Sequence, residues 1–310
     1  MAERDVYFAS EAEAKKYKIK KVLSHILVYG FLTVLGLFIV LPFYYMIITS
    51  FKSTQAFADE ETSGKLVLFL TGNNFSVEQF GKVMSGSTSF GIFYLNTIYV
   101  AVISTVFTLT TTVLAAFAFA RVNFKGKDAL FMILLATMMI PGEMMMMTNY
   151  QTTVMLNWQN TFAALIFVHG VSVFYIFYLR QTFQQIPNEL FLAAKVDGYG
   201  HFQYLWKCMI PIASPTIITI AILSLMGAWN AYIWPTLIAS GKNTVLQGMG
   251  IDHSMHLVSN GLMSKFTSEF QNDIPARVTG SLFATIPLFI FFLIFRKSIM
   301  KGVSRSGIKG

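Results

Sequence analysis

The segment that organises this sequence is Asn188–Gly198, NELFLAAKVDG, which is followed by Pro211 thirteen positions beyond the glycine. It belongs to a polar stretch, Arg180 to Cys208, that has long apolar segments on both sides. This stretch is longer than a tight turn between two membrane spans, and it can fold into two short helices. We therefore expect it to present a surface to another molecule.

The composition of the chain indicates a membrane protein. Of the 310 residues, 55% are hydrophobic and 12% are charged, which is about half the charged fraction of a soluble domain. The mean hydropathy of +0.58 agrees. The single cysteine, Cys208, excludes an internal disulfide and a cysteine-rich metal site. Residues 1–21 are polar and lack the apolar core of a cleavable signal peptide.

Six segments have the apolar character and length that a membrane crossing needs, which is about 20 residues. They are Val22–Ser50, Phe90–Ala120, Ala129–Thr148, Thr161–Leu179, Met209–Ala239 and Gly280–Phe295. The sequence thus predicts an all-α polytopic membrane protein with six transmembrane helices.

Lysine and arginine residues fall unevenly on the two sides of these six segments. Residues 1–21, the turn 121–127, the stretch 180–208 and the tail beyond Phe295 hold 17 of them, and the other loops hold 6. Cytoplasmic loops carry the excess of basic residues, so both termini and the 180–208 stretch are predicted to be cytoplasmic. This distribution also explains the net charge of +8 without nucleic acid.

The predicted organisation follows from this topology. Residues 1–21 form a cytoplasmic N-terminal segment, residues 22–296 a transmembrane domain and residues 297–310 a cytoplasmic tail. The transmembrane domain contains the cytoplasmic loop 180–208 and an outer loop, 240–279.

The residues around Asn188 carry helix start and stop signals. Pro187 suits the start of a helix, and Asn188 and Glu189 place an acceptor and a negative charge in its first turn. Gly198 can end the helix with a positive φ, and His201–Lys207 can form a second one. A docking surface and an amphipathic loop on lipid headgroups fit these residues equally well.

Helix breakers interrupt several of the predicted spans. They are Pro42, Pro141–Gly142, Pro211, Pro215, Pro235 and Pro287. In lipid, a backbone carbonyl freed by proline must find another partner, so such sites tend to face protein or a cavity. A gated assembly and ordinary helix kinks are both consistent with them.

The order Pro187, Glu189, Ala193–Ala194, Asp197–Gly198 and Ile210–Pro211 resembles the cytoplasmic signature loop of binding-protein-dependent ABC importer permeases. More specifically, the chain resembles the second, maltose-type permease subunit of the carbohydrate importers. The resemblance covers nearly the whole length. It includes Tyr45–Lys52, Asn96–Thr97, Ile140–Glu143, Gly227–Asn230 with Trp234–Pro235, and the tail that ends Gly307–Gly310.

The resemblance implies that the loop fits into a cleft of a cytoplasmic ATPase and transmits ATP-driven closure to the spans. A central cavity would then open alternately outward and inward. The residues implied in this coupling are Glu189, Leu192, Ala193, Ala194, Asp197, Gly198 and Pro211. Leu192 occupies the position of the family's glutamate, so either the docking is more apolar here or the partner permease carries the more typical loop.

The resemblance also implies the assembly and the solute. The partners would be a second permease subunit in a heterodimer, two ABC ATPase subunits and an extracytoplasmic solute-binding protein, in the lipid of a prokaryotic cell membrane. The sequence has no glycine-rich phosphate loop, so no cofactor is expected on this chain, and ATP and magnesium would be bound by the partner ATPase. The expected solute is an oligosaccharide, with glycerol phosphate or another polyol-type solute as the alternative.

Two groups of residues are candidates for the substrate pathway. Glu143 is a carboxylate near the outer end of a span, and intramembrane carboxylates are often functional, although a helix-end glutamate can simply reach water. Trp229, Asn230 and Tyr232 combine aromatic faces with an amide, as sugar sites do. The same residues would also suit helix–helix contact and an interfacial aromatic belt.

Two further groups of residues could suggest a binding site, but each has a simpler explanation. Asp252, His253 and His256 are ligand types, but in a polar loop they are expected to be solvated, so no metal site is predicted. Met144–Met147 suits flexible packing within a span.

Two other classes of protein fit the sequence less well. An autonomous secondary transporter or channel would need ionisable residues deep in the spans, and only Glu143 qualifies. An intramembrane enzyme would need a clustered nucleophile, acid or metal set, and the sequence shows none.

Overall fold

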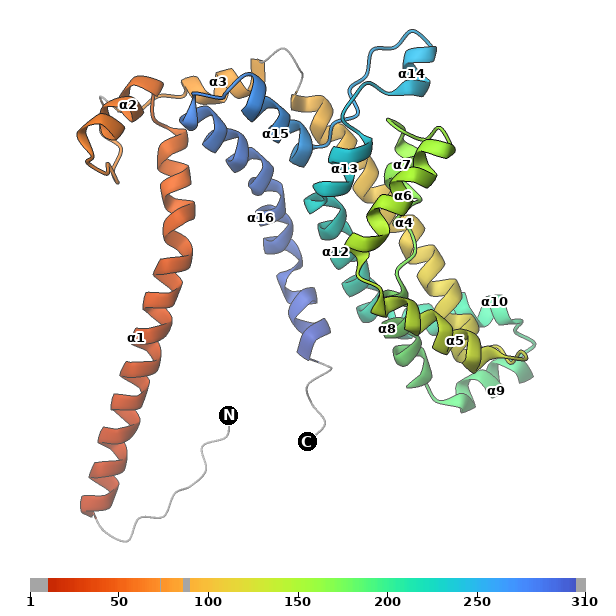
Figure 1. The fold of residues 1–310 in the computed structure, drawn as a ribbon. Coiled ribbons are helices and arrows are strands. Elements are labelled where there is room, and N and C mark those ends of the chain that lie inside the picture. The colour runs from red at the N-terminus through yellow and green to blue at the C-terminus, as the bar shows by residue number, and fades with distance from the viewer. Residues whose placement is uncertain (1–10, 73, 86–89, 305–310) are drawn as a thin grey trace. The chain divides into compact units, whose positions relative to one another are not determined.

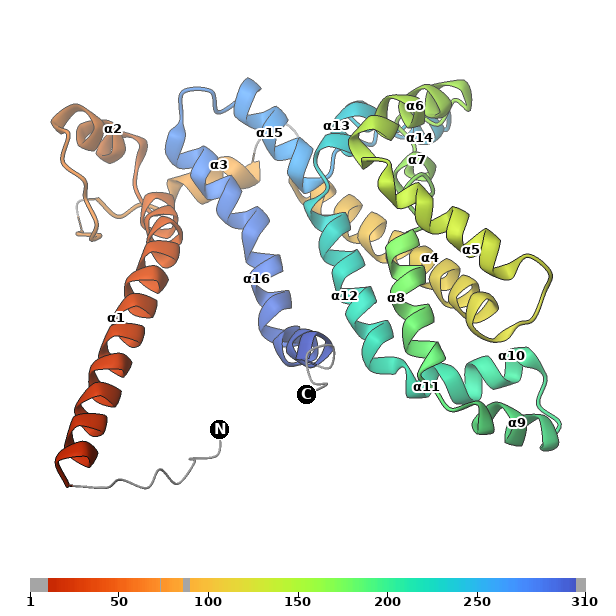
Figure 2. The same cartoon turned by 60° about the horizontal axis from the view of Figure 1, so that its bottom comes forward.

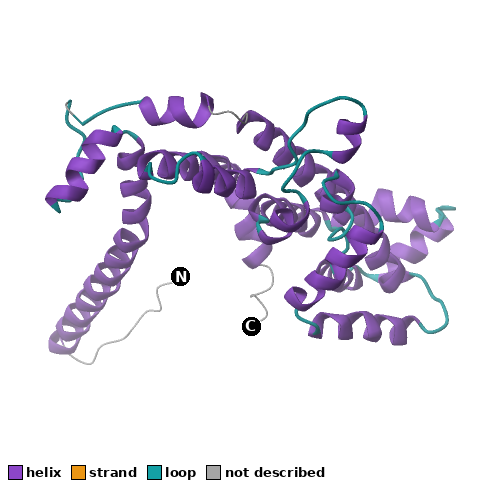
Figure 3. Ribbon diagram, turned by 45° about the horizontal axis from the view of Figure 1, so that its top comes forward, coloured by secondary structure: helices purple, strands orange, loops and turns teal. Residues whose placement is uncertain are grey.

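The structure is a computed structural model that describes residues 11–72, 74–85 and 90–304. Within these ranges the chain is helical with connecting loops, and no strand is present (Figure 3). The predicted all-α class is therefore confirmed for the described residues. The chain divides into two compact units, Met1–Phe80 and Gly81–Gly310, which are described separately below.

The first unit consists of one long helix and a small folded segment at its end. It contains α1 (Glu11–Ser50) and α2 (Thr54–Ser63), and α3 (Glu78–Ser85) begins in it. Ser53 caps α2 by accepting a hydrogen bond from the Ala56 amide, and Gly64 ends the helix at φ 63°.

A buried ion pair holds this folded segment together. The side chain of Lys52 is 1% exposed and that of Glu60 is 7% exposed, and the Lys52 ammonium donates to the Glu60 carboxylate. Both groups also bond the backbone of Val67, whose carbonyl accepts from Lys52 and whose amide donates to Glu60, each at 2.8 Å. A buried charge is tolerated when it is paired and hydrogen-bonded in this way.

The second unit contains the remaining elements. They are α4 (Phe90–Arg121), α5 (Lys127–Ala136), η1 (Thr137–Met139), α6 (Gly142–Met155), α7 (Phe162–Ile166), α8 (Val173–Gln184), α9 (Asn188–Val196), α10 (His201–Tyr204), η2 (Leu205–Met209), α11 (Ile210–Ile212), α12 (Ser214–Asn230), α13 (Ile233–Ile238), α14 (Thr244–Gly248), α15 (Val258–Ser268) and α16 (Ile274–Ser304).

Helix α4 is the centre of this unit. It packs along α8 and α12, and α12 also contacts α16 (Figure 1). Three clusters of buried residues lie along these contacts, one at the α9–α10 end, one beside α7 and α13, and one between α4, α15 and α16.

Three helices are long and apolar enough to cross a membrane. They are Lys15–Ser50, Phe90–Arg121 and Ile274–Lys297. Two bent pairs raise the number to as many as 5 in the described residues: Lys127–Met139 with Gly142–Met155, bent by 98°, and His201–Ile212 with Ser214–Asn230, bent by 81°. These spans agree with a polytopic membrane protein, while the count of six and the side of the termini stay predictions.

The structure differs from the predicted segments in several places. The third predicted span is bent at 140–142, and the fifth is bent at Ala213 and interrupted between α12 and α13. The fourth predicted span is two separate helices, α7 and α8, joined by residues 167–172. Helix α1 begins at Glu11 and α16 continues to Ser304, so both extend beyond the predicted spans into the predicted N-terminal segment and tail. Residues 1–10 and 305–310, including the predicted Gly307–Gly310 ending, lie outside the described residues.

The interruption between α7 and α8 lies close to α4. A side chain at Gly170 would meet the Phe107 ring at 2.2 Å, so only glycine allows this close approach to α4. The Thr111 hydroxyl on α4 donates to the freed carbonyl of Gly170 at 3.2 Å. The protein itself thus provides a hydrogen-bond donor for a carbonyl that is outside a regular helix and among apolar helices.

Candidate functional site

The loop between α8 and α12 folds as the sequence predicts at its start. Pro187 precedes α9 with an extended backbone, φ −55° and ψ 141°, and Glu189 lies in the first turn. Its carboxylate therefore sits near the positive end of the helix dipole. Asn188 Oδ1 accepts a hydrogen bond from Arg121 at 3.4 Å.

Helix α9 ends in a Schellman motif. Gly198 has φ +81°, its amide donates to the Lys195 carbonyl at 3.0 Å, and the Tyr199 amide donates to the Ala194 carbonyl at 2.8 Å. These two bonds satisfy carbonyls that the end of a helix leaves free. The left-handed backbone explains why the sequence has glycine at this position.

The return to the membrane passes through a π-helical turn. The predicted second helix, His201–Lys207, is found as α10 followed by η2, and the Ile210 amide donates to the Leu205 carbonyl five residues back. Pro211 follows directly. Proline has no N–H and crowds the carbonyl four residues before it, which displaces the α-helical bonding pattern at this point.

Aromatic and aliphatic side chains of the loop pack against the buried core. Phe191 on α9 stacks on His201, with ring centroids 5.8 Å apart, and meets Tyr204 edge-on at 5.1 Å. Tyr204 is 1% exposed and belongs to a buried cluster with Phe117 of α4 and Phe183 of α8. The loop therefore shares a core with the helices that it connects.

Arg121, at the end of α4, ties the start of the loop to that helix. Its guanidinium donates to the Phe183 carbonyl at 2.9 Å and to the Ile186 carbonyl. Arg180 makes a similar link, because its Nε donates to the Phe119 carbonyl at 3.1 Å and its guanidinium lies 4.0 Å from the centre of the Phe131 ring. Arg121 donates from two guanidinium nitrogens, and Arg180 combines one hydrogen bond with stacking on an aromatic ring; the planar guanidinium suits both arrangements.

The predicted coupling residues divide into an exposed set and one buried residue. Ala194 is 6% exposed and packs into this chain's own cluster. The others are all exposed: Glu189, Leu192, Ala193, Asp197, Gly198 and Pro211. Leu190 and Val196 add apolar surface to the same helix, and Val196 is 88% exposed.

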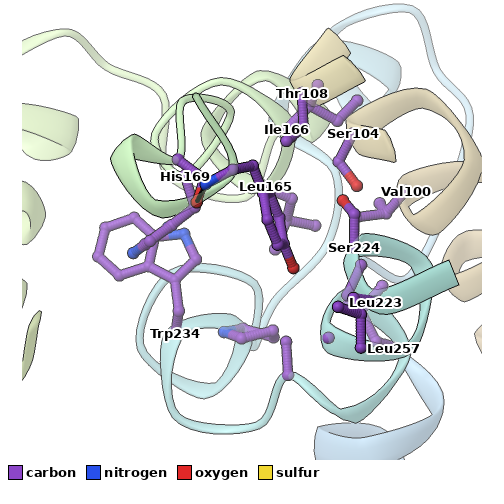
Figure 4. A pocket seen from close by; sticks show the side chains of 16 residues that line it. Val100, Ser104, Thr108, Leu165, Ile166, His169, Leu223, Ser224, Trp234 and Leu257 are labelled. Atoms are coloured by element: carbon purple, nitrogen blue, oxygen red, sulfur yellow. Dashed lines mark hydrogen bonds between the residues drawn. The ribbon is translucent and has the colours of Figure 1, made fainter. Parts of the chain in front are cut away.

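A cavity of about 300 Å³ lies between α4, α7, α8, α12 and α13. Its polar groups are the hydroxyls of Ser104, Thr108, Ser172, Tyr175 and Ser224 and the imidazole of His169. Figure 4 shows Ser104 and Ser224 pointing toward each other and His169 beside Trp234, whose ring centroid lies 5.0 Å from that of the imidazole. The volume is at the lower end of ligand pockets.

The predicted pathway residues do not line this cavity. Trp229 instead donates from Nε1 to the Ala284 carbonyl of α16 at 3.3 Å, which is a helix–helix contact. Asn230 caps its own helix through the Met226 carbonyl at 3.0 Å. Tyr232 is 42% exposed, and Glu143 is exposed in the first turn of α6. Their pathway role stays a prediction.

Sequence reasoning missed the polar residues of the cavity. Ser104, Thr108 and Ser224 are scattered through apolar spans and form no motif, so only the packing of α4 against α12 brings them together. His169 has no other potential catalytic or ligand residue near it in the sequence. It lines the cavity because it lies in the interruption between α7 and α8, which the sequence did not reveal.

The three outer-loop residues Asp252, His253 and His256 have separate partners. Asp252 pairs with Lys242 at 2.7 Å, His253 bonds Asn96 at 2.8 Å, and His256 bonds Ser254 at 2.9 Å. Burial lowers the pKa of the His256 imidazole below its ordinary value of 6.5. Among the described residues, no group of three or more His, Cys, Asp or Glu side chains could hold a metal ion.

Asn96 and Thr97 anchor this outer loop to the start of α4. The Asn96 amide donates to the Ser254 and His256 carbonyls at 2.7 and 3.0 Å, and the Thr97 hydroxyl accepts from the Val258 amide at 2.8 Å. Both side chains are buried. This gives a physical reason for a polar pair at the beginning of an apolar helix.

Comparison with known proteins extends the resemblance. Residues 109–305 match the family described as "Binding-protein-dependent transport system inner membrane component". The arabinooligosaccharides transport system permease protein AraQ of Halalkalibacterium halodurans is 25% identical over 95% of this chain and 100% of its own. The maltodextrin transport system permease protein MalD of Streptococcus pneumoniae is 25% identical over 94% of this chain and 98% of its own.

Solved structures with the same fold include a chain of a bacterial ABC transporter involved in the import of the acidic polysaccharide alginate. The TM-score is 0.68 at 21% identity, and the match covers 94% of this chain and 99% of that one. A bacterial alginate ABC transporter in complex with alginate pentasaccharide-bound periplasmic protein gives a TM-score of 0.58 at 15% identity, covering 93% and 97%. The likeness concerns the fold.

Proposed function

Because the chain belongs to the family of binding-protein-dependent transport system inner membrane components, we propose that it is a permease subunit of an ATP-driven importer of carbohydrates. The family places it in the prokaryotic cell membrane as a multi-pass protein, and its long apolar helices agree. Its part in the importer is transport and not catalysis.

The observation that carries the proposal is the construction of α9. Its outer surface presents Leu192, Val196 and Asp197 to the solvent, and its inner surface places Ala194 and Phe191 on the buried cluster. That cluster contains residues of α4, α8 and α12. A partner that moves α9 would therefore push on three of the longer helices through packed side chains, which are stiff enough to transmit displacement.

We infer that this partner is an ATPase subunit and that it binds α9 mainly through apolar contacts. Leu190, Leu192 and Val196 are exposed by 44%, 54% and 88%. Glu189 and Asp197 would supply charge at the two ends of this surface. ATP and magnesium would be bound by the ATPase chain, because this sequence has no phosphate-binding loop.

The solute class is supported by the cavity and by the relatives. The names of AraQ and MalD refer to arabinooligosaccharides and maltodextrin. Hydroxyl groups, an imidazole and a tryptophan line the cavity, and none of its lining residues is lysine or arginine. A phosphate-bearing solute would need cationic partners there, so a neutral oligosaccharide is favoured over glycerol phosphate.

The transport cycle that we propose is alternating access. The chain would form half of the pathway with a second permease subunit, in six spans with both termini in the cytoplasm, and two ATPase subunits would engage the cytoplasmic loops. The solute would be delivered by a binding protein on the other side. The interruptions at 140–142, at 167–172 and between α12 and α13 supply places where helix segments can reorient.

The test is uptake by the complete importer in proteoliposomes. The solute is identified as the molecule that remains bound to the solute-binding protein that co-purifies with the complex. We expect its uptake to require ATP, the ATPase subunits and the binding protein. Uptake by this chain without any ATPase would establish a secondary transporter or channel and overturn the proposal.

A further inference from the structure

Phe202 and Trp206 form an exposed aromatic pair on residues 201–212, the return arm that leads from α9 back to α12. They are four residues apart, their ring centroids are 6.3 Å apart, and they are 64% and 58% exposed. The opposite side of the same arm is fully buried, since Tyr204, Leu205 and Met209 are exposed by 1% or less. The arm is thus amphipathic, with aromatic groups on its open side.

The geometry of the arm relates it to the membrane. Residues 201–212 form one helical stretch that bends by 81° from α12. In the proposed topology α12 crosses the membrane, so a stretch that bends by 81° from it and is directly continuous with it runs along the membrane surface. At about 1.5 Å per residue the stretch is roughly 18 Å long. It cannot move away from the surface without changing the bend at Ala213.

The two short helices of the loop differ in their distance from the spans. In Figures 1 and 2, α9 lies at the far end of the unit and α10 lies beside the end of α4. The aromatic pair is therefore on the part of the loop that is next to the membrane, while the apolar surface of α9 is on the part that is farther away.

We propose that Phe202 and Trp206 insert into the headgroup–acyl boundary of the cytoplasmic leaflet. Amphipathic aromatic rings, tryptophan above all, prefer this layer. Lys207 is exposed next to Trp206, and its ammonium lies 5.0 Å from the centre of the Tyr199 ring. A cation at this level also favours anionic lipid headgroups.

The anchor would fix the depth at which α9 is presented. The arm is held on one side by the buried cluster and on the other by lipid, so a push on α9 would turn the base of α12 instead of displacing the whole loop. The inference depends on the proposed function only for the orientation of α12 across the membrane.

Spin-label accessibility in nanodiscs tests the anchor with the complete importer. Single cysteines would replace Trp206, Phe202 or Val196 in a background with Cys208→Ser and cysteine-free partner chains. Labels at 206 and 202 are expected to collide with oxygen, which partitions into lipid, more often than with a water-soluble nickel chelate. Two separate positions protect the test against one variant that fails to assemble.

The outcomes separate the two proposals. A label at 206 or 202 that favours the nickel chelate, or one shielded from both reagents by protein, would overturn the lipid anchor. The label at Val196 reports the docking of the ATPase instead, because it should be shielded from both reagents in the complete complex. Free access of the nickel chelate to position 196 would contradict the coupling role and leave the lipid anchor standing.

Discussion

Replacing Gly198 tests whether the shape of α9 matters for transport. The glycine has φ +81°, and a Cβ added there would meet no atom within 4 Å. A substitution therefore strains the backbone without creating a clash in the chain. For an L-residue the left-handed conformation costs about 1–2 kcal/mol. This cost lowers the population of the capped loop, relative to uncapped forms, by roughly 5–30-fold.

Gly200 is a matched control two residues away. It also has open space around its Cβ position, but its backbone is extended, with φ −72° and ψ 167°. Gly200→Ala should therefore avoid left-handed strain and cost less than Gly198→Ala, its one penalty being that alanine is a poorer N-cap of α10 than glycine. Gly198→Ala should impair transport and Gly198→Val should impair it more, because a β-branched residue tolerates positive φ least.

The assay compares ATP-dependent uptake with ATP hydrolysis in proteoliposomes. We expect the Gly198 variants to insert normally, to lose uptake and to retain part of the hydrolysis. Gly198→Asn separates strain from crowding of the docking surface, because asparagine tolerates the left-handed region but is larger than alanine. The reasoning would be refuted if Gly198→Val imported solute at the rate of Gly200→Ala.

Three further predictions concern polar side chains that are buried or half-buried. Arg121→Met should destabilise the start of the loop by about 1–3 kcal/mol, because two backbone carbonyls lose their donor, and faster proteolysis of the loop would report it. Lys52→Met should cost about 3–5 kcal/mol by leaving Glu60 buried and unpaired, and adding Glu60→Gln should restore much of the thermal stability. The pKa of His256 is lowered, so its contribution to stability is complete above about pH 6.5 and declines below it. Cleavage of the outer loop should therefore accelerate at pH 5, and His256→Asn should remove most of that acceleration; an unchanged pH response would count against the assignment.

The sequence predicted the local fold of the 180–208 loop well because its signals are local. Pro187, Asn188 and Gly198 are start and stop residues whose effects extend over a single turn, and α9 begins and ends where they indicate. The exposure of Leu192 and the burial of Ala194 were harder to anticipate. Two adjacent alanines look alike in a sequence, and only the placement of α9 on the Phe191–Tyr204 cluster distinguishes them.

The spans were predicted less completely because hydropathy does not record interruptions. Residues 161–179 read as one apolar segment, yet the helix is interrupted there, where Gly170 lies close to Phe107. The cavity residues Ser104 and Ser224 lie far apart in the chain and carry no motif. Such sites depend on which helices become neighbours, and that is a long-range property.

Photo-cross-linking from position 196 tests the central claim most directly. Val196 is 88% exposed on the outer surface of α9, so a cross-linker there should not disturb the core. In membranes that contain the assembled importer, the account predicts a covalent product between this chain and an ATPase subunit, and its yield should change when ATP is added. Cross-links to lipid alone, or none to an ATPase in importers that still transport, would contradict the coupling role of α9.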